Sequence, residues 1–392
     1  MDIRKIALYV FAIWLTGVAC IGGPSVKNGA GEELAGEWYR RYEGVIAGQQ
    51  VVVNLHHFDG RMEGSYYYMQ KGEITNLEDA EETADGYNCN LNEAERVNHT
   101  DRFEEDNYKP DHWAINFRGN TVKGKLVSGD GKNVSGIDIA ESYAAGSYRL
   151  GVMLHGDSVQ EKIDRTNTQA ISYYEFLTPS AQMGGADAAF LLAIELHLLG
   201  GDTLGAENLK EYIKKEDKKY FMKYRMLLKD LTIDERKGHD DDWEYNFVHS
   251  RTVLVLYNDG GILSLGINDY DHSGGSSAHG IYLSNYACVD IRYKKIWRLR
   301  DIMNIDATML RPLLEAEVRK MFKAGTGDDL RKILTVNEVP LTENVFITGT
   351  GVTFCYNPMV ISTEEDGEIS VFLPYSKLNG MLKEDFKKRM RL

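Results

Sequence analysis

The chain has 392 residues, of which 43% are hydrophobic, and this is enough for two ordinary domains with apolar cores. Forty-five basic against 59 acidic side chains give a formal net charge of -14, which repels phosphate backbones. These values exclude a largely disordered chain, and we expect no nucleic-acid partner.

The first segment has the pattern of an export signal. Two basic residues precede an apolar run from Ile6 to Ala19, shorter than the about 20 residues needed to span a bilayer. The four residues ending at Cys20 resemble the lipobox of bacterial lipoproteins, although they also suit ordinary small-x-small cleavage. We predict a signal peptide over residues 1–19, lipidation at Cys20 and a linker over residues 20–36. The protein is then lipid-anchored to a membrane of the cell envelope, facing the periplasm or the exterior.

Residues 37–160 have the pattern of an antiparallel β-meander. Short alternating and aromatic-rich runs are separated by turns that contain Gly. In one run, Tyr66 and Tyr68 share a face and Tyr67 points to the opposite one. Exposed aromatic rings on a sheet can stack on sugars, so Tyr66, Tyr67 and Tyr68 form a candidate binding face. Structural packing of the same tyrosines is the interpretation we favour.

A second domain is predicted over residues 170–392, where helices join the strands. Ala186 to Leu199 is almost wholly apolar and predicts a buried helix, whereas Glu207 to Leu228 predicts a charged one. For the lysines of the charged helix we favour a solvated face over binding to an anionic polymer. Thr308 to Phe322 predicts a helix with one apolar stripe. Strands and helices in separate blocks indicate an α+β fold, a β-meander domain followed by a mixed or antiparallel sheet with packed helices.

The densest group of reactive side chains lies between two predicted strands, in residues 268–280. This Gly- and Ser-rich loop holds the candidate functional residues Asp269, Tyr270, Asp271, His272 and His279. Metal binding needs at least three converging ligands, and serine catalysis needs a base and an oxyanion hole; no local pattern supplies them. We favour a structural loop whose Asp and His side chains bond to the main chain. We predict no metal site and no cofactor, and no motif identifies a catalytic residue.

Three cysteines remain if Cys20 is lipidated, and an odd number cannot form a complete disulfide framework. Cys288 and Cys355 lie in strand-like runs. They could pair in an oxidising compartment or remain as two unpaired core thiols. Both alternatives stay open on the sequence alone.

A series of short motifs runs through the C-terminal half of the chain. They are Tyr270, Gly274-Gly275, Ala278-His279-Gly280, Leu299 to Ile302, Phe346 to Thr348, Gly351 to Phe354, Tyr356 to Pro358 and Pro374-Tyr375. In order and spacing they resemble the extracytoplasmic region of RsiV-type anti-sigma factors and of proteins with the N-terminal module of the PdaC peptidoglycan deacetylase. The resemblance implies a shortened PdaC-like segment over about residues 170–240 and an RsiV-like domain over about residues 241–392.

This resemblance implies an extracytoplasmic module that binds cell-wall components or wall-active proteins. We therefore predict a membrane-anchored lipoprotein that binds a cell-wall glycan or a protein such as lysozyme. The alternative is a hydrolase of peptidoglycan or carbohydrate that uses His279 with Asp269 or Asp271 for acid/base chemistry. Since the motifs of the deacetylase domain are absent from the sequence, we expect binding rather than catalysis.

Overall fold

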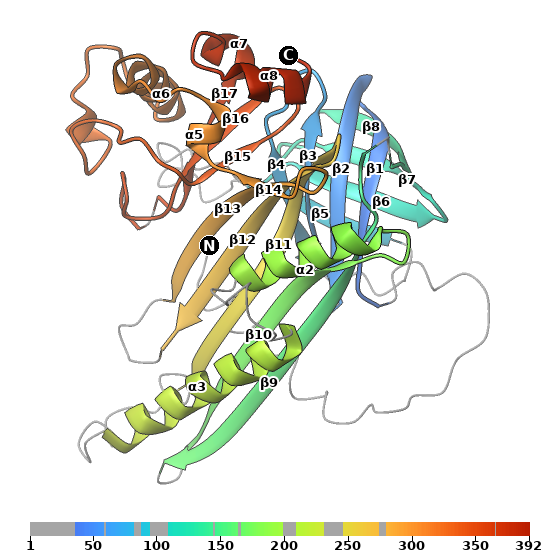
Figure 1. Cartoon of the computed structure of the whole chain (residues 1–392), viewed down its shortest axis with the longest axis vertical. Helices are drawn as coiled ribbons and strands as arrows, with labels where there is room; N and C mark the ends of the chain where they lie inside the picture. Colours follow the sequence, from blue (N-terminus) through green and yellow to red (C-terminus); the bar gives the residue numbers. More distant parts are fainter. Residues whose placement is uncertain are drawn as a thin grey trace.

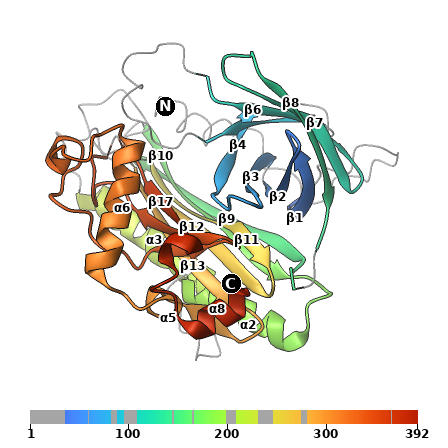
Figure 2. The same ribbon diagram turned by 90° about the horizontal axis from the view of Figure 1, so that it is seen from above.

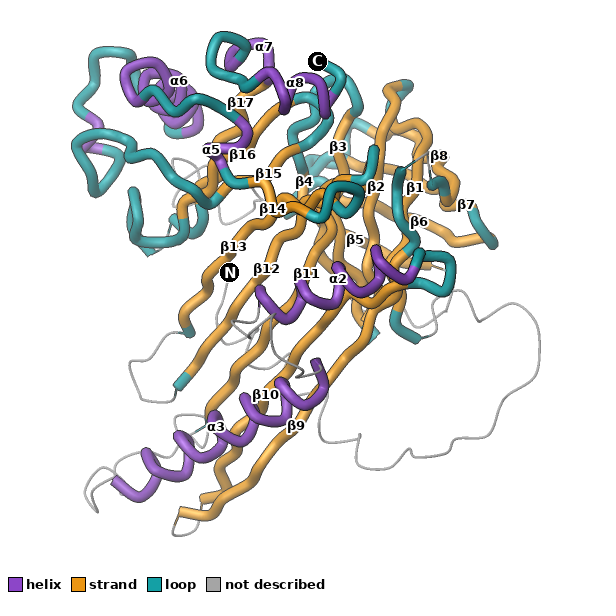
Figure 3. Tube along the Cα trace, viewed as in Figure 1, coloured by secondary structure: helices purple, strands orange, loops and turns teal. Residues whose placement is uncertain are grey.

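The computed structural model describes residues 36–58, 60–81, 88–94, 109–143, 146–163, 166–198, 209–230, 246–273, 280–364 and 366–392. These residues form a closed barrel, a six-stranded sheet and a three-stranded sheet, with helices packed on the two open sheets (Figure 1). Figure 3 shows that helices are confined to the part of the chain after the barrel. The chain is therefore a mixed α+β structure. Within the described ranges, no helix combines the length and the apolar character that crossing a membrane requires.

The N-terminal strands form an antiparallel barrel that is closed by the pairing of β1 with β8. The strands are β1 (Trp38–Ile46), β2 (Gln49–Phe58), β3 (Arg61–Tyr68), β4 (Thr75–Glu81), β5 (Asn88–Glu93), β6 (His112–Arg118), β7 (Thr121–Val127) and β8 (Val134–Glu141). Gly48, Gly60 and Gly119 have positive φ in the tight turns, a conformation that glycine adopts without steric cost. Alternate side chains, with Tyr42 and Trp113 fully buried, fill the interior. The predicted meander thus has a core of its own.

The six-stranded sheet has the order β14-β13-β12-β11-β10-β9. Its strands are β9 (Leu150–Ile163), β10 (Thr166–Pro179), β11 (Phe247–Asp259), β12 (Ile262–His272), β13 (Ile281–Asp290) and β14 (Lys295–Trp297). β10 and β11 run parallel because α2 (Gly185–Leu198) and α3 (Leu209–Asp230) connect them, and the other neighbours are antiparallel. Since β9 pairs with β10 over its whole length, the domain boundary predicted at residue 160 falls inside this sheet.

The two faces of this sheet are covered by different parts of the chain, because successive residues of a strand point to opposite faces. Val253 and Val255 of β11 pack with Leu191 of α2. Leu254 and Leu256 point the other way and join the core shared with the barrel and the C-terminal strands. Figure 2 shows the barrel on the opposite side of the sheet from α2 and α3.

The C-terminal part of the chain is a small antiparallel sheet flanked by helices. The elements are α5 (Leu299–Ile302), α6 (Ala307–Met321), the 3-10 helix η2 (Leu330–Lys332), β15 (Val345–Ile347), β16 (Gly351–Tyr356), β17 (Ile369–Pro374), α7 (Tyr375–Leu378) and α8 (Glu384–Met390). Asp306 caps α6 by accepting a hydrogen bond from the Thr308 N–H (2.9 Å). Leu310, Leu314 and Val318 form its buried stripe, which confirms the helix predicted here.

Barrel side chains bond to the part of β11 that β10 leaves unpaired. β10 and β11 pair only from Ala170–Phe247 to Tyr174–Arg251, whereas β11 continues to Asp259. Beyond this point, the Val255 N–H donates to His56 Nε2 (3.0 Å) and Ser65 Oγ donates to the Val255 carbonyl (3.3 Å). Asn54 Nδ2 donates to the Leu256 carbonyl (3.2 Å). Buried backbone groups therefore find partners on the barrel, as burial demands.

The contact with Val255 fixes the protonation of His56. Because Nε2 accepts a hydrogen bond, the proton sits on Nδ1, which lies 3.3 Å from Glu175 Oε1. Both side chains are fully buried. Burial lowers the pKa of His56 to about 4 and raises the pKa of Glu175 to about 8. At neutral pH we therefore describe this contact as a hydrogen bond between mainly uncharged groups.

Cys288 and Cys355 are buried thiols that do not form a disulfide here, and Cys89 is buried as well. Cys288 Sγ contacts the Val345 carbonyl at 3.6 Å, in the core between the two open sheets. Burial raises the pKa of the Cys288 thiol to about 12 and that of Cys355 well above its usual range. These thiols act as small apolar core residues.

Removing the His56 side chain leaves the Val255 N–H and Glu175 without their barrel partner. We expect His56→Ala to lower the free energy of unfolding by about 2–4 kcal/mol, from an unpaired buried donor and a cavity. Urea unfolding followed by circular dichroism measures this loss. His112→Ala, at a half-buried position on the same barrel, is the matched control. An equally small change in both variants would contradict the role given to His56.

Glu175 also makes the stability depend on pH. Its folded pKa of about 8 lies above the ordinary value of 4.5, so between these values the folded state holds a proton that the unfolded state releases. Stability from this group is complete below pH 4.5 and is lost as pH rises through about 8. We expect the stability of Glu175→Gln relative to wild type to increase over this window, by at most about 1.4 kcal/mol per pH unit.

Urea unfolding of both proteins at about pH 5 and about pH 8 measures this difference in the free energy of unfolding. His56 also titrates in the unfolded state over this range, but it does so in both proteins, so its contribution cancels. The exposed Glu364→Gln is the control. A constant difference between Glu175→Gln and wild type would show that Glu175 is charged in the folded state.

Candidate functional site

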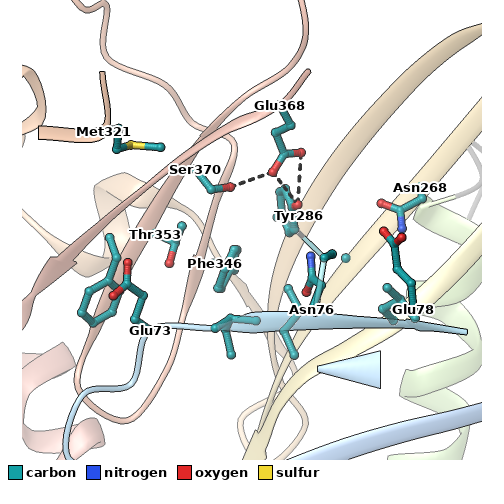
Figure 4. Close-up of a pocket in the computed structure, with 16 residues that line it drawn as sticks. Glu73, Asn76, Glu78, Asn268, Tyr286, Met321, Phe346, Thr353, Glu368 and Ser370 are labelled. Carbon is teal, nitrogen blue, oxygen red and sulfur yellow. Dashed lines mark hydrogen bonds between the residues drawn. The ribbon is translucent and has the colours of Figure 1, made fainter. Parts of the chain in front are cut away.

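A pocket of about 250 Å³ lies where the barrel, the six-stranded sheet and the C-terminal sheet meet (Figure 4). The barrel side supplies Glu73, Ile74, Asn76, Glu78 and Ala94; the six-stranded sheet supplies Leu254, Leu256, Gly266, Asn268 and Tyr286; and the C-terminal part supplies Met321, Phe346, Thr353, Glu368, Ser370 and Phe372. Small-molecule sites span about 300–1,000 Å³. This pocket therefore suits a group the size of one sugar ring or one long side chain.

One wall of the pocket holds a carboxylate and its hydrogen-bond donors. Tyr286 Oη donates to Glu368 Oε1 (2.8 Å) and Oε2 (3.1 Å), and Ser370 Oγ donates to Oε1 (2.7 Å). Burial raises the pKa of Glu368, while these hydrogen bonds oppose the rise because they stabilise the charged form. The two donors therefore hold the Glu368 carboxylate in place as an acceptor at the pocket wall.

The barrel side of the pocket adds negative charge and amides. Glu73 and Glu78 flank Asn76 on the chain, and Figure 4 shows Glu78 pointing toward Asn268 of β12. Burial raises the pKa of Glu78. Three carboxylates and no Lys, Arg or His occur among the residues that line this pocket. The site therefore disfavours anions and favours hydroxyl, amide or ammonium groups.

Aromatic rings form the apolar part of the pocket. The rings of Phe346 and Tyr286 lie 5.0 Å apart, and Phe372 and Met321 complete this side. An apolar surface beside a few positioned polar groups is the usual composition of a small-ligand site. The arrangement can bind a ligand with one apolar face and a polar rim.

A comparison with protein families assigns the C-terminal side of the pocket to one domain. The family described as "Protein of unknown function (DUF3298)" matches residues 300–376, which include α6 and the strands β15 to β17. Residues 300–376 form a DUF3298 domain. All six pocket residues from the C-terminal part, from Met321 to Phe372, belong to this DUF3298 domain.

Two solved bacterial structures resemble the chain. A DUF3298 family member from Bacteroides fragilis is 20% identical, with a TM-score of 0.51 and a match covering 61% of this chain and 97% of that one. A DUF3298 family protein from Pseudomonas aeruginosa is 15% identical, with a TM-score of 0.40 and coverage of 60% and 96%. At such identity the first likeness shows the fold alone. A comparison with curated proteins found no significant match.

The two predicted acidic residues of the 268–280 loop lie on the helix-covered face of β12. Asp269 is held by the Arg251 guanidinium, with Nη2 donating to Oδ2 at 3.0 Å. Asp271 lies 3.4 Å from His249 Nδ1 and accepts a hydrogen bond from Ser273 Oγ (2.7 Å). The contact with His249 lowers the pKa of Asp271. Both carboxylates thus have structural partners, outside the pocket.

The other loop residues are also in structural contacts where the structure describes them. Tyr270 packs against Tyr282, with ring centroids 5.6 Å apart, and His272 Nδ1 donates to the Asn246 carbonyl (2.9 Å). His272 is buried. Cys20 and His279 lie outside the described residues, so lipidation and a role for His279 stay predictions.

The predicted aromatic face on β3 is not an exposed surface. Tyr66 is 4% exposed inside the barrel and donates to Glu93 Oε1 (2.7 Å). Tyr67 is 5% exposed and packs against Tyr257, at a centroid distance of 6.2 Å. Tyr68 is half-buried against the edge of Tyr66. Closure of the barrel on one side and its contact with the sheet on the other bury this run on both faces.

Sequence reasoning missed most of the pocket. Glu73, Glu78, Tyr286 and Glu368 come from three segments far apart in the chain, and no local spacing connects them. Asn268, the first residue of the predicted 268–280 loop, is the one residue of that loop that lines the described pocket. The signal that could have found it is alternation in β12, which places Asn268 on the face opposite to Asp269.

Loss of one donor should change how Glu368 titrates. We expect Ser370→Ala to raise the pKa of Glu368 further, because a hydrogen bond that stabilises the carboxylate is removed while burial stays. Carbon-13 NMR titration of the Glu368 carboxyl measures the change. Ser273→Ala, which removes the equivalent bond to Asp271, is the control. An unchanged or lower pKa in Ser370→Ala would show that the Ser370 contact does not act on the carboxylate.

Proposed function

We propose that this protein is a cell-envelope lipoprotein that binds a cell-wall glycan in the pocket between the barrel and the DUF3298 domain. The observation that carries the proposal is the composition of the pocket, which joins aromatic surface to carboxylates and amides without a basic residue. Sugars offer an apolar ring face and a rim of hydroxyl and amide groups, and this pocket complements both.

Binding agrees with the geometry better than hydrolysis does. The predicted acid/base carboxylates, Asp269 and Asp271, are engaged by Arg251 and His249. A hydrolase needs an acid and a base within reach of one bond, and these contacts face away from the pocket. Glu368 is held by two donors, which suits an acceptor that orients a ligand.

A wall-active protein is the second candidate ligand. A surplus of three carboxylates fits the ammonium or guanidinium of a protruding Lys or Arg side chain as well as a sugar. A cationic protein such as lysozyme would meet this requirement. The motifs that resemble RsiV-type proteins, from Leu299 to Tyr375, support the same candidate. Lipidation at Cys20 would keep the pocket close to the wall.

We expect Glu368→Gln to weaken glycan binding by about tenfold, because a charged acceptor is replaced by an uncharged group of similar shape. Isothermal titration calorimetry with muropeptides and with chitin oligosaccharides measures the affinity, and the same titration with lysozyme tests the second candidate. Glu364→Gln, exposed and outside the pocket, is the matched control.

Three outcomes separate the hypotheses. If Glu368→Gln loses sugar binding and Glu364→Gln does not, the glycan site is supported. If Glu368→Gln loses lysozyme binding but keeps sugar binding, the protein ligand is supported. Equal affinity of wild type and both variants removes the pocket from the function. Release of new reducing ends during incubation with peptidoglycan would establish hydrolysis instead.

A further inference from the structure

The outer face of α3 combines positive charge with exposed methionines. The helix carries eight basic and four acidic residues, in a chain whose formal net charge is -14. Lys215, Lys219, Met222 and Met226 follow one another at helical spacings of four, three and four, so they form one stripe. Met222 is 55% exposed and Met226 58% exposed.

The opposite face of α3 ties the helix to the sheet. Ile213, Phe221, Tyr224 and Leu228 are buried against it. The buried Asp217 accepts hydrogen bonds from Ser172 Oγ (2.6 Å) and His155 Nε2 (2.6 Å). The helix is thus fixed in rotation, and its lysine and methionine stripe points outward. Figure 1 shows α3 along the outside of the sheet, on β9 and β10.

We propose that this stripe, together with Lys218, which lies three residues after Lys215 and four before Met222 on the same face, docks on an anionic lipid surface. Lysines next to a bilayer are attracted by acidic headgroups, and methionine side chains can enter the interface between headgroups and acyl chains. An anionic polymer accounts for the lysines but gives no partner to the two exposed thioethers that follow them on the same face. The combination therefore favours lipid, and it does not depend on the proposed glycan pocket.

Vesicle co-sedimentation of the chain without the predicted signal peptide, residues 20–392 carrying Cys20→Ser, tests the proposal without an acyl anchor or the apolar run Ile6 to Ala19. Vesicles of equal parts phosphatidylcholine and phosphatidylglycerol are compared with phosphatidylcholine alone. We expect binding to the mixed vesicles, and a loss of about tenfold or more in the triple variant Lys215→Gln, Lys218→Gln, Lys219→Gln. The matched control replaces the exposed barrel residues Lys123, Lys125 and Lys132 by Gln, with the same change in net charge.

The pair Met222→Gln, Met226→Gln distinguishes lipid from polymer. Weaker vesicle binding in this variant, with unchanged binding to soluble polyglutamate, supports docking on lipid. Vesicle binding that is equal in wild type and the α3 lysine variant overturns the proposal. The proposal is also overturned if the lysine variant loses binding to polyglutamate while neither the lysine variant nor the methionine variant changes vesicle binding. In that case the stripe binds an anionic polymer.

Discussion

The contact on which the structure depends is the one between barrel side chains and the unpaired edge of β11. Where β10 ends its pairing, backbone groups of Val255 and Leu256 are buried, and each unpaired group would cost about 1–3 kcal/mol. Asn54, His56 and Ser65 supply the missing partners. A neighbouring strand normally does this. Because side chains do it here, the barrel and the sheet share a buried polar seam although each has a core of its own.

This seam places the pocket. It fixes β2 and β3 against β11, and β3 in turn carries β4, whose Asn76 and Glu78 reach the site. The open edge of β13 is closed in a similar way from the DUF3298 domain. Asn344 Oδ1 accepts from the Tyr286 N–H (2.9 Å), and Asn344 Nδ2 donates to the Ser284 carbonyl (2.9 Å). Tyr286 is thereby held where its hydroxyl meets Glu368. The pocket exists because two sheet edges are closed by side chains.

Local patterns predict the elements of this fold, whereas its closures depend on contacts distant in sequence. Apolar periodicity predicts α2, α3 and α6 to within a few residues, and alternation with Gly turns predicts β1, β2, β3, β6 and β7 but not β4, β5 or β8. The pairing of β1 with β8, which closes the barrel around Tyr66, has no local signal. The acidic loop residues have cross-strand partners, Arg251 and His249, that register alone determines. The pocket residues come from three segments that are far apart in sequence, so no local spacing pattern could predict that they lie together.

The six-stranded sheet also stands between the pocket and α3. The pocket residues Leu254 and Leu256 lie on the face shared with the barrel, while α3 packs on the other face through Ser172 and Asp217. The three pocket carboxylates therefore lie on one side of the sheet, and the lysine stripe of α3 lies on the other. Attraction between the α3 lysines and an anionic surface acts over about one Debye length of 8–10 Å, so it would favour an approach with α3 toward that surface. If α3 rests on a bilayer, the acidic pocket faces away from it, toward the space in which a glycan or a cationic protein is met.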